Sequence, residues 1–514
     1  MPPLFRENAR ALLTNKELSI QNNPKSIINK VFNKTKKVAV VTAAYNCAEY
    51  LPKTIDSVIN QTIGFENIQY IIVDDGSTDS TKQIIEEYAT KFKNICYVAL
   101  HKNTGSPGTP RNIGIELANA DYITFLDADD WLAPKGIETL VRILDETNDD
   151  YVVGKTIKVT EKGESIIGEF ASVKERRKIS PFYIPHFFYH MGPTARMMKL
   201  ALLKDKEIGF PEMVFAEDKL FFCDVFLAAQ TVSTTTEPIY YVNRLEENRD
   251  SLTRSTHVLE KRKSDLKVID YIKEKKLPIE KEKVILNRLY EYDFVKTFDS
   301  QLFVKSGQKE DFLSLLHQVI ETTNDLRYDF KEQFKNPLYR VSIELFLENR
   351  IEDFTNLFVW FKNDKNKKYV IKNSLPYYEV PFLKDKYKYI PMNLFARALD
   401  SYIIGNTFYQ HVEIFGDDLD RVNHVLIRDR TKHDNDLIVN FERNGNLITY
   451  KIHLEELTKL SPSLFTVFLR FDEYQLLNIK KILKNQVSYD NRAVEFYTSI
   501  ANNLGISIKP IKKE

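Results

Sequence analysis

The sequence is poor in the residues that mark disulfide-stapled, zinc-binding and membrane-spanning proteins. Only three of its 514 residues are cysteines, and they are widely spaced with no C-x-x-C pair. This pattern argues against a disulfide framework and a zinc site, and is typical of a protein of the reducing cytoplasm. No run of about 18 apolar residues and no apolar leader occurs. We therefore expect a cytoplasmic protein whose association with the inner face of the membrane is at most peripheral.

An excess of charge of one sign is also missing. The 73 lysines and arginines almost balance the 72 acidic residues, which gives a formal net charge of +1. Without a global basic field we expect no nucleic-acid partner, and any anionic ligand must be held by a local group of side chains. A hydrophobic share of 43% with 28% charged residues is ordinary for a globular protein of two to four domains.

Changes in composition divide the chain into four regions. Residues 1–36 are polar and form an N-terminal extension, either a helix packed on the first domain or a mobile arm. Residues 37–256 carry an α/β pattern, and residues 257–367 have the apolar spacing of a helical linker. Residues 368–514 contain short β-rich runs between turns such as Asn444-Gly445, which predicts a β-sandwich. Within the linker we expect helices at 258–276, 281–302, 309–323 and 342–364.

From Lys37 onward, strand and helix patterns alternate four times with short connections. Four apolar runs have the length and composition of buried strands, at 38–42, 70–73, 95–100 and 122–126. Such alternation predicts parallel strands joined by right-handed crossovers. This region is therefore expected to be a nucleotide-binding type of α/β sheet.

Polar side chains follow each of these four strands. They are Tyr45 and Asn46, Asp74 and Asp75, Pro110 to Asn112, and Asp127, Asp129 and Asp130. Because the carboxyl ends of parallel strands meet at one edge, these loops should form a single ligand crevice. Asp75 could accept hydrogen bonds from a base or ribose, and Arg111 could pair with phosphate or stack on a base. Helix capping would explain the presence of Asp79 and Ser77 without any ligand, but it would not explain both Asp74 and Asp75 at the end of the strand.

The acidic turn after the fourth strand has the chemistry of a cation site. Oxygen ligands such as those of Asp127, Asp129 and Asp130 suit a hard divalent cation, and we expect all three to project into the crevice. A solvated acidic turn ahead of the helix near Pro134 is the alternative, and a single D-x-D does not exclude it. The polar ends of the other three strands favour the ligand site.

Four motifs in fixed order resemble those of the inverting family 2 glycosyltransferases, which have the GT-A fold. They are V-V-T-x-x-Y-N, V-D-D-G-S-T-D, P-R-N and F-L-D-A-D-D. The resemblance implies a UDP-sugar donor and a divalent cation, Mn²⁺ or Mg²⁺, held on Asp129. It further implies that the donor side is formed by Ala44, Tyr45, Asp75, Pro110, Arg111, Asn112, Asp127, Ala128, Asp129, Glu217, Arg244, Arg249 and Ser251.

Glu217 and Asp218 precede an apolar helix. Asp218 could be a helix N-cap, where the helix dipole stabilises a carboxylate. Inversion at an anomeric carbon, however, needs a carboxylate opposite the leaving diphosphate. In family 2 enzymes an E-D pair supplies it, so the resemblance makes Asp218 the general base and Glu217 a contact to the donor sugar or acceptor. Arginines of the loop that follows, Arg244 and Arg249 among them, would neutralise the departing UDP.

A closer resemblance lies in G-P-T-A-R and A-E-D-K-L-F-F, which begin at Gly192 and Ala216. These segments resemble the TarS and TarP type of enzyme, which adds N-acetylglucosamine to the poly(ribitol-phosphate) of wall teichoic acid. The resemblance implies an anionic polyol-phosphate polymer as acceptor, and a homotrimer formed through the C-terminal sandwich. That family tends to carry a histidine where this chain has Asn248, and Arg249 is a candidate substitute.

Three alternatives remain at this point. The chain could glycosylate another cell-surface polysaccharide, such as a capsule or another teichoic acid. A sugar nucleotidyltransferase would need a glycine-rich basic loop, which residues 43–46 do not provide. A non-catalytic glycan-binding scaffold would not need both D-A-D and E-D. His186 and His190 are spaced four apart without a nearby carboxylate, and we expect them to be packing or acceptor-side residues and not a metal pair.

Overall fold

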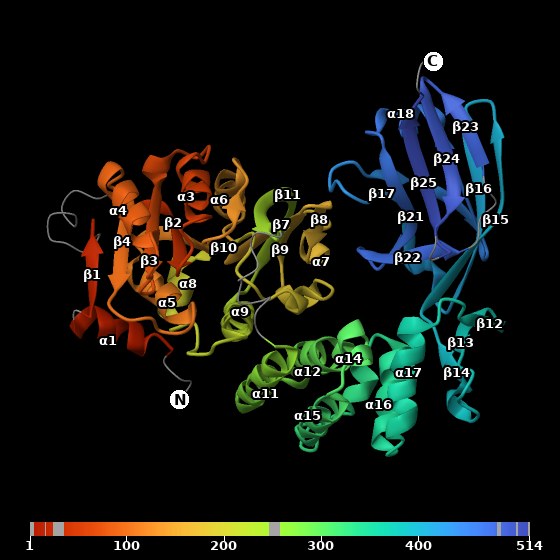
Figure 1. Cartoon of the computed structure of the whole chain (residues 1–514), viewed down its shortest axis with the longest axis horizontal. Coiled ribbons are helices and arrows are strands. Elements are labelled where there is room, and N and C mark those ends of the chain that lie inside the picture. Colours follow the sequence, from red (N-terminus) through yellow and green to blue (C-terminus); the bar gives the residue numbers. More distant parts are fainter. Residues whose placement is uncertain are drawn as a thin grey trace. The chain divides into compact units, whose positions relative to one another are not determined.

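The computed structural model describes residues 5–15, 17–23, 35–245, 257–480, 485–499 and 502–511. The chain divides into two compact units, and their helices and strands are labelled in Figure 1. The first comprises residues 1–161 and 166–285, and the second comprises 162–165 and 286–514. The predicted fold class is confirmed: an α/β catalytic-type sheet is followed by a helical region and a β-rich C-terminal region.

The four predicted parallel strands form the centre of the first unit. Their order in the sheet is β4-β3-β2-β5, and every pair among them is parallel. The sheet continues through β10, which is antiparallel to β5, and then through β7, β11 and β6. The strands are β2 (Lys36–Ala44), β3 (Ile68–Asp74), β4 (Ile95–Leu100), β5 (Ala120–Phe125), β6 (Trp131–Leu132), β7 (Tyr151–Thr160), β8 (Gly163–Ile167), β9 (Arg176–Ile179), β10 (Arg196–Lys199) and β11 (Val232–Asn243).

Helices surround this sheet (Figure 1). The apolar faces of α3, α4 and α6 share one core with the buried strands, to which Val40, Ile72 and Leu144 contribute fully buried side chains. At Gly114 the helix α5 approaches β2 so closely that an added Cβ would lie 2.3 Å from Val41 Cγ1. The helices are α3 (Leu51–Ile59), α4 (Thr81–Lys91), α5 (Gly108–Leu117), α6 (Gly136–Thr147), α7 (Glu169–Ser172), α8 (Leu200–Asp205), α9 (Glu217–Ala228) and α11 (Val258–Glu274).

The N-terminal residues form a helix packed on the first unit, one of the two alternatives expected, and a strand that the composition did not predict. After the helix α1 (Glu7–Asn15), the strand β1 (Leu18–Gln21) pairs antiparallel with β4 and forms an edge of the sheet. Arg6, only 2% exposed, lies 3.0 Å from Glu116 and 3.1 Å from Glu207. Residues 24–34 of the N-terminal extension lie outside the described residues.

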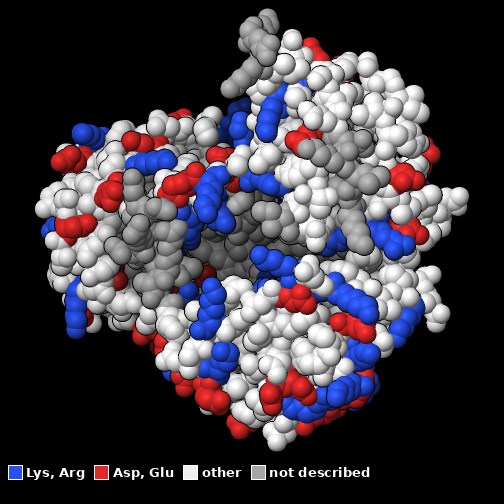
Figure 2. Space-filling view, turned by 45° about the vertical axis from the view of Figure 1, so that its right-hand side comes forward, with Lys and Arg blue, Asp and Glu red and all other residues white. Residues whose placement is uncertain are grey.

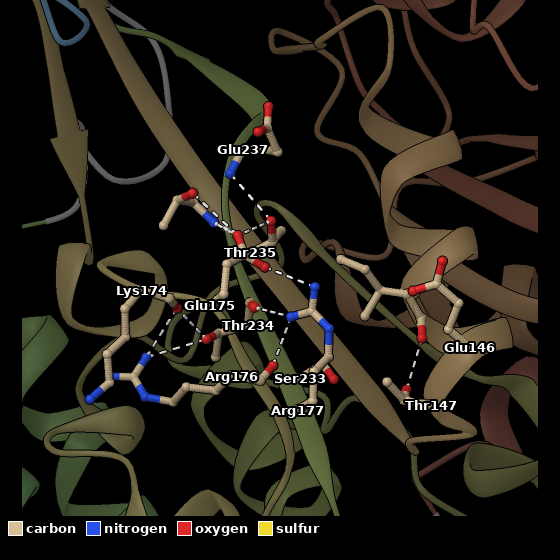
Figure 3. A network of polar contacts seen from close by, with 12 residues as sticks. Glu146, Thr147, Lys174, Glu175, Arg176, Arg177, Ser233, Thr234, Thr235 and Glu237 are labelled. Atoms are coloured by element: carbon tan, nitrogen blue, oxygen red, sulfur yellow. Dashed lines mark hydrogen bonds and ion pairs between the residues drawn. The ribbon is translucent and has the colours of Figure 1, made fainter.

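A network of hydrogen bonds joins β9 to the threonine-rich part of β11 (Figure 3). Arg177 Nη1 donates to the carbonyl of Thr234 (2.7 Å), and Arg176 Nη1 donates to Thr234 Oγ1 (3.2 Å). Glu175 accepts from the Thr235 hydroxyl (2.7 Å). These contacts fix the position of β11, whose last residue is at the acidic turn described below.

Helices begin the second unit, together with a π-helical segment at Arg288–Val295. The single helix expected at 342–364 is two helices, because Asn349 takes a left-handed conformation (φ +59°) that ends the first of them. Among the described residues no helix is both long and apolar enough to cross a bilayer. Most of α12 (Ile279–Asn287) still belongs to the first unit. The helices of the second unit that follow it are α13 (Lys296–Phe298), α14 (Gln301–Lys305), α15 (Lys309–Glu321), α16 (Pro337–Leu347) and α17 (Ile351–Asn363).

The C-terminal region is β-rich, as expected. A three-stranded sheet is followed by strands that pack around a separate apolar core, and Gly445 (φ +61°) makes the predicted turn between β19 and β20. The elements are β12 (Lys368–Lys372), β13 (Leu375–Glu379), β14 (Tyr389–Pro391), β15 (Leu394–Ile404), β16 (Thr407–Gly416), β17 (Val422–Asp429), β18 (Leu437–Val439), β19 (Phe441–Asn444), β20 (Leu447–His453), α18 (Leu454–Lys459), β21 (Ser463–Phe471), β22 (Gln475–Lys480), β23 (Asn485–Tyr489), β24 (Arg492–Thr498) and β25 (Leu504–Pro510).

Candidate active site

The ends of β2 and β3 are tied together at the edge of the sheet. The backbone N–H of Asp75 donates to the carbonyl of Ala44 (2.8 Å). The Asp75 carboxylate accepts from the N–H and the hydroxyl of Thr104 (2.9 Å each), and it is 4% exposed. Burial raises the pKa of Asp75, and the bonds from Thr104 oppose the rise. Tyr45, by contrast, is 50% exposed, so its ring is available to a ligand.

The remaining polar residues of this edge hold the two loops in place. Asp79 accepts from the N–H groups of Ala48 (3.2 Å) and Thr81 (3.0 Å), at the start of α4. Ser77 Oγ accepts from the N–H of Asn46 (3.0 Å). The structural explanation of Asp79 and Ser77 is thus supported by their contacts, and neither is a ligand candidate.

Arg111 joins the two halves of the candidate site. Its Nη2 lies 2.8 Å from Asp127 Oδ1, and its Nη1 lies 2.9 Å from Glu217 Oε1. The guanidinium also lies 5.2 Å from the centre of the Phe210 ring. Burial alone would lower the pKa of Arg111, but the charges of Asp127 and Glu217 raise it, so the side chain stays cationic. The D-A-D turn and the E-D pair, 90 residues apart in the chain, therefore meet at one guanidinium.

The three carboxylates of the acidic turn have different surroundings. Asp127 is partly exposed, and its backbone N–H donates to the hydroxyl of Tyr240 (3.0 Å). Asp129 is also partly exposed, whereas Ala128 is buried and its carbonyl accepts from the Thr54 hydroxyl (2.9 Å). The expectation that Asp130 projects into the site is wrong. That residue is 2% exposed and its carboxylate accepts from the backbone of β11, because the turn folds back onto the strand.

Glu217 and Asp218 begin α9 and carry unusual proton affinities. Burial and then the charge of Asp218 raise the pKa of Glu217 to about 7, although Arg111 opposes the rise. Burial likewise raises the pKa of Asp218, while Arg111 and Lys219 lower it. Asp218 remains partly exposed. A carboxylate of raised basicity at the surface of a site has the properties of a general base.

Asn112 and Pro110 are both buried in α5. The amide of Asn112 donates to the carbonyls of Phe5 (2.9 Å) and Phe210 (2.8 Å) and accepts from the Phe210 N–H (2.8 Å). The side chain is 1% exposed, and its hydrogen-bonding capacity is filled by backbone groups. Pro110 is buried within α5. The contacts of Asn112 therefore support a structural role, whereas the donor contact expected of Pro110 stays a prediction.

Arg244 lies at the end of β11 near the acidic turn. Its backbone N–H donates to the carbonyl of Val159 (2.9 Å), and its Nη1 donates to the carbonyl of Asn243 (2.7 Å). Burial raises the pKa of Asp130, and the charge of Arg244 opposes part of that rise. The expected contacts from Arg249 and Ser251 lie outside the described residues.

Residues 39–203 match the family described as Glycosyl transferase family 2. The chain is 32% identical over 230 residues to the poly(ribitol-phosphate) beta-N-acetylglucosaminyltransferase TarP of Staphylococcus aureus, a match that covers 43% of this chain and 68% of that protein. The chain belongs to glycosyltransferase family 2. It is also 30% identical over 206 residues to a poly(ribitol-phosphate) beta-glucosyltransferase of Bacillus spizizenii, covering 40% of this chain but only 32% of that protein. The match thus spans about a third of this second relative.

Solved structures of this family share the fold. S. aureus TarS is similar with a TM-score of 0.57 at 19% identity, over 93% of this chain and 86% of that one. TarS 1–349 in complex with UDP-GlcNAc is similar with a TM-score of 0.56 at 22% identity, over 69% of this chain and 99% of that one.

The acidic turn carries a concentration of negative charge. Burial raises the pKa of Asp130, and the charges of Asp129 and Asp127 raise it further. A divalent cation would relieve this concentration of negative charge. No cluster of three or more histidine, cysteine or acidic side chains with metal-binding geometry occurs among the described residues. Diphosphate oxygens and water would therefore have to complete the coordination, as is common for Mg²⁺.

Several residues of the site carry no motif in the sequence. Tyr240 supports the acidic turn from β11, and Phe210 stacks on Phe221 (3.9 Å between ring centres) beneath Arg111. Lys219 forms an ion pair with Asp265 of α11, and the side chain of Asp265 is fully buried. A tyrosine, a phenylalanine and an ion pair between distant segments have no local pattern, so they could not be predicted from the sequence.

Proposed function

We propose that this family 2 protein transfers N-acetylglucosamine, with inversion, from UDP-N-acetylglucosamine to a hydroxyl of a poly(ribitol-phosphate) chain. The observation that carries the proposal is the bridge from Asp127 through Arg111 to Glu217. It brings the D-A-D turn, which suits a sugar nucleotide, next to the E-D pair, which suits a general base. The names of the TarP and TarS relatives supply the donor sugar and the acceptor.

In this mechanism Asp218 removes the proton of the acceptor hydroxyl. The acceptor oxygen attacks the anomeric carbon on the face opposite the diphosphate, and UDP leaves with the electron pair of the broken bond. The raised pKa of Asp218 favours proton uptake at the moment of attack. Glu217, held by Arg111, would contact the donor sugar or the acceptor.

The donor would lie along the carboxyl edge of the sheet. Tyr45 would stack on the uracil and Asp75 would face the ribose, near Ala44, Arg111 and Ala128. A divalent cation, Mn²⁺ or Mg²⁺, would be held by Asp129 and would supply positive charge to the diphosphate. Arg244, with Arg249 and Ser251 from the following loop, would bind the departing UDP.

The acceptor would be an anionic polyol-phosphate polymer, reached at the inner face of the cell membrane. Lysine and arginine side chains are interspersed with acidic ones over the face shown in Figure 2, so phosphates would be met by individual cations. A different cell-surface polysaccharide is the alternative acceptor.

The test measures UDP release from UDP-N-acetylglucosamine with ribitol-phosphate polymer, with and without EDTA. Asp218→Asn should bind the donor yet lose activity by about 100-fold or more, as expected for a missing general base. Asp121→Asn is the matched control, because that carboxylate pairs with Lys37 near the surface, where a charge pair contributes little. Full activity of Asp218→Asn would refute the assignment. UDP-glucose, and capsule or other teichoic acid polymers, serve as competing substrates.

We also propose that residues 368–514 join three copies of the chain. The support is the resemblance to TarS-type enzymes and the separate core of this region. Light scattering of the full chain and of a chain ending near residue 367 tests the idea. A full-length monomer at micromolar concentration would refute it.

A further inference from the structure

Gly192 lies between Asp218 and His190. An ideal Cβ placed on Gly192 would be 3.5 Å from Asp218 Oδ2 and 3.8 Å from His190 Nε2. All three residues are partly exposed, so an acceptor can reach this point. The backbone of Gly192 is not in the left-handed region that only glycine adopts readily. The absence of a side chain at Gly192 therefore leaves space next to Asp218, and is not needed for the backbone conformation.

The orientation and the proton of His190 are fixed by Arg196. Arg196 Nη2 donates to the carbonyl of His190 (3.0 Å) and lies 3.2 Å from its Nδ1. Arginine is only ever a donor, so Nδ1 must accept and the ring proton belongs on Nε2. The ring also packs closely on Gly168, where a Cβ would lie 2.5 Å from Nδ1. His190 thus presents an N–H from Nε2 on the side of Gly192.

Arg196 is built into the sheet beneath this point. It is 1% exposed, its Nε donates to the carbonyl of Thr194 (3.0 Å), and its guanidinium lies 4.7 Å from the centre of the Phe222 ring. The residue belongs to β10, whose backbone carbonyl at Arg196 accepts from the Thr124 hydroxyl (2.6 Å). A buried guanidinium held in this way cannot follow a ligand, and acts as a rigid support for the imidazole.

We propose that the acceptor hydroxyl binds over Gly192, donating its proton to Asp218 Oδ2 and accepting a hydrogen bond from His190 Nε2–H. Arg196 is then a positioning residue that acts through His190. This inference rests on the proposed transferase function and adds the acceptor subsite to it. As the acceptor oxygen bonds to the anomeric carbon, its proton passes to Asp218 and the bond to UDP breaks. A hydroxyl oxygen at the place of this Cβ would lie 3.5 Å from Asp218 Oδ2 and 3.8 Å from His190 Nε2. Both distances are longer than hydrogen bonds, as is usual before substrate closes a site.

The first test is Gly192→Ala. The new methyl group would meet its neighbours at ordinary van der Waals distance, so folding and donor binding should persist. It would occupy the place of a carbon-linked hydroxyl, whereas water is smaller and can adjust. We expect the ratio of polymer glycosylation to donor hydrolysis to fall by about 10-fold or more, the range of one lost hydrogen bond. Gly307→Ala is the control, because an added Cβ there meets nothing within 4 Å.

The second test compares His190→Gln with His190→Leu. Glutamine can present an N–H near the place of Nε2, whereas leucine cannot, so Gln should retain at least about 10-fold more transfer than Leu. The effect should fall on kcat/KM for the polymer, with the KM for the donor little changed. Arg196→Lys should loosen the hold on the His190 ring and so also lower kcat/KM for the polymer.

The outcomes separate this inference from the function on which it rests. If the unmodified protein neither hydrolyses nor transfers from a UDP-sugar, the proposed function fails. If it transfers normally and Gly192→Ala keeps the wild-type ratio, or if His190→Leu matches His190→Gln, the acceptor subsite is elsewhere and this inference is overturned.

Discussion

Glu217 should make the first unit less stable at the pH at which it works. Its pKa rises from an ordinary 4.5 to about 7 because the carboxyl is buried beside Asp218. As the pH falls through 7 the folded protein takes up this proton, whereas the unfolded chain does so only near 4.5. Between these values the folded state binds more protons, so this group makes stability rise as the pH falls. Glu217→Gln, which is always neutral, should therefore stabilise the unit at high pH.

The size of the effect follows from the two pKa values. At about 1.4 kcal/mol for each tenfold change in proton affinity, a rise from 4.5 to about 7 corresponds to about 3 kcal/mol at pH 8. At pH 5.5 the folded carboxyl is already protonated, and the advantage of glutamine should shrink to about 1 kcal/mol. The pKa of about 7 already contains the stabilising charge of Arg111, so loss of the ion pair needs no separate correction. The glutamine oxygen of the Glu217→Gln variant could still accept a hydrogen bond from that guanidinium.

The two tryptophans allow this unit to be followed by itself. Trp131 stacks on Tyr241 in the first unit (5.6 Å, 6° between ring planes), and Trp360 lies in the second. In a Trp360→Phe background, urea unfolding read by fluorescence would report the surroundings of Trp131. We expect Glu217→Gln to raise the urea midpoint at pH 8 more than at pH 5.5, while transfer activity falls. An equal shift at both pH values, or a loss of stability at pH 8, would refute the reasoning.

Three further changes should destabilise the first unit, measured by the same urea midpoints. Arg6→Met removes a buried partner of Glu116 and should lower the free energy of unfolding by about 3 kcal/mol. A loss of less than about 1 kcal/mol would show that this contact of the N-terminal residues does not stabilise the fold. Asp265→Asn leaves the buried ammonium of Lys219 with less compensating charge and should lower the free energy of unfolding by about 3 to 5 kcal/mol. Replacing both partners, with Asp265→Leu and Lys219→Met, should restore most of that stability, and a double variant as unstable as Asp265→Asn would contradict this explanation. Gly114→Ala overpacks α5 against the sheet and should cost about 1 to 3 kcal/mol; wild-type stability would contradict the close approach.

The strands and motif loops could be predicted because their signals are local. An apolar run of strand length followed by polar residues describes both β3 with Asp75 and β5 with Asp127, and each signal fits within about ten residues. Alternation with helices then places the strand ends at one edge. The convergence of the acidic turn with Glu217 could be expected only from the resemblance, and Arg111 is the contact that supports it.

The parts that could not be predicted depend on contacts between distant segments. Asn112 was expected to contact the donor, yet its amide is filled by the backbone at Phe5 and Phe210. Asp130 has the same residue type as Asp129 but is turned onto β11. Residues 18–21, Leu-Ser-Ile-Gln, alternate apolar and polar side chains, but a run of this length is too short to predict a strand by itself. The break at Asn349 was missed since asparagine only sometimes adopts a left-handed conformation.

The pairing of β1 with β4 bears on how the catalytic unit can be shortened. Each residue from Leu18 to Gln21 pairs with one from Leu100 to Tyr97, and all six residues of β4 are buried. A truncation at Lys36, where the composition changes, would strip this cover and leave a flat apolar strand with open amide and carbonyl groups. Such an edge recruits strands from other molecules. The shortened protein would then precipitate or form aggregates, although every residue of the donor edge was kept.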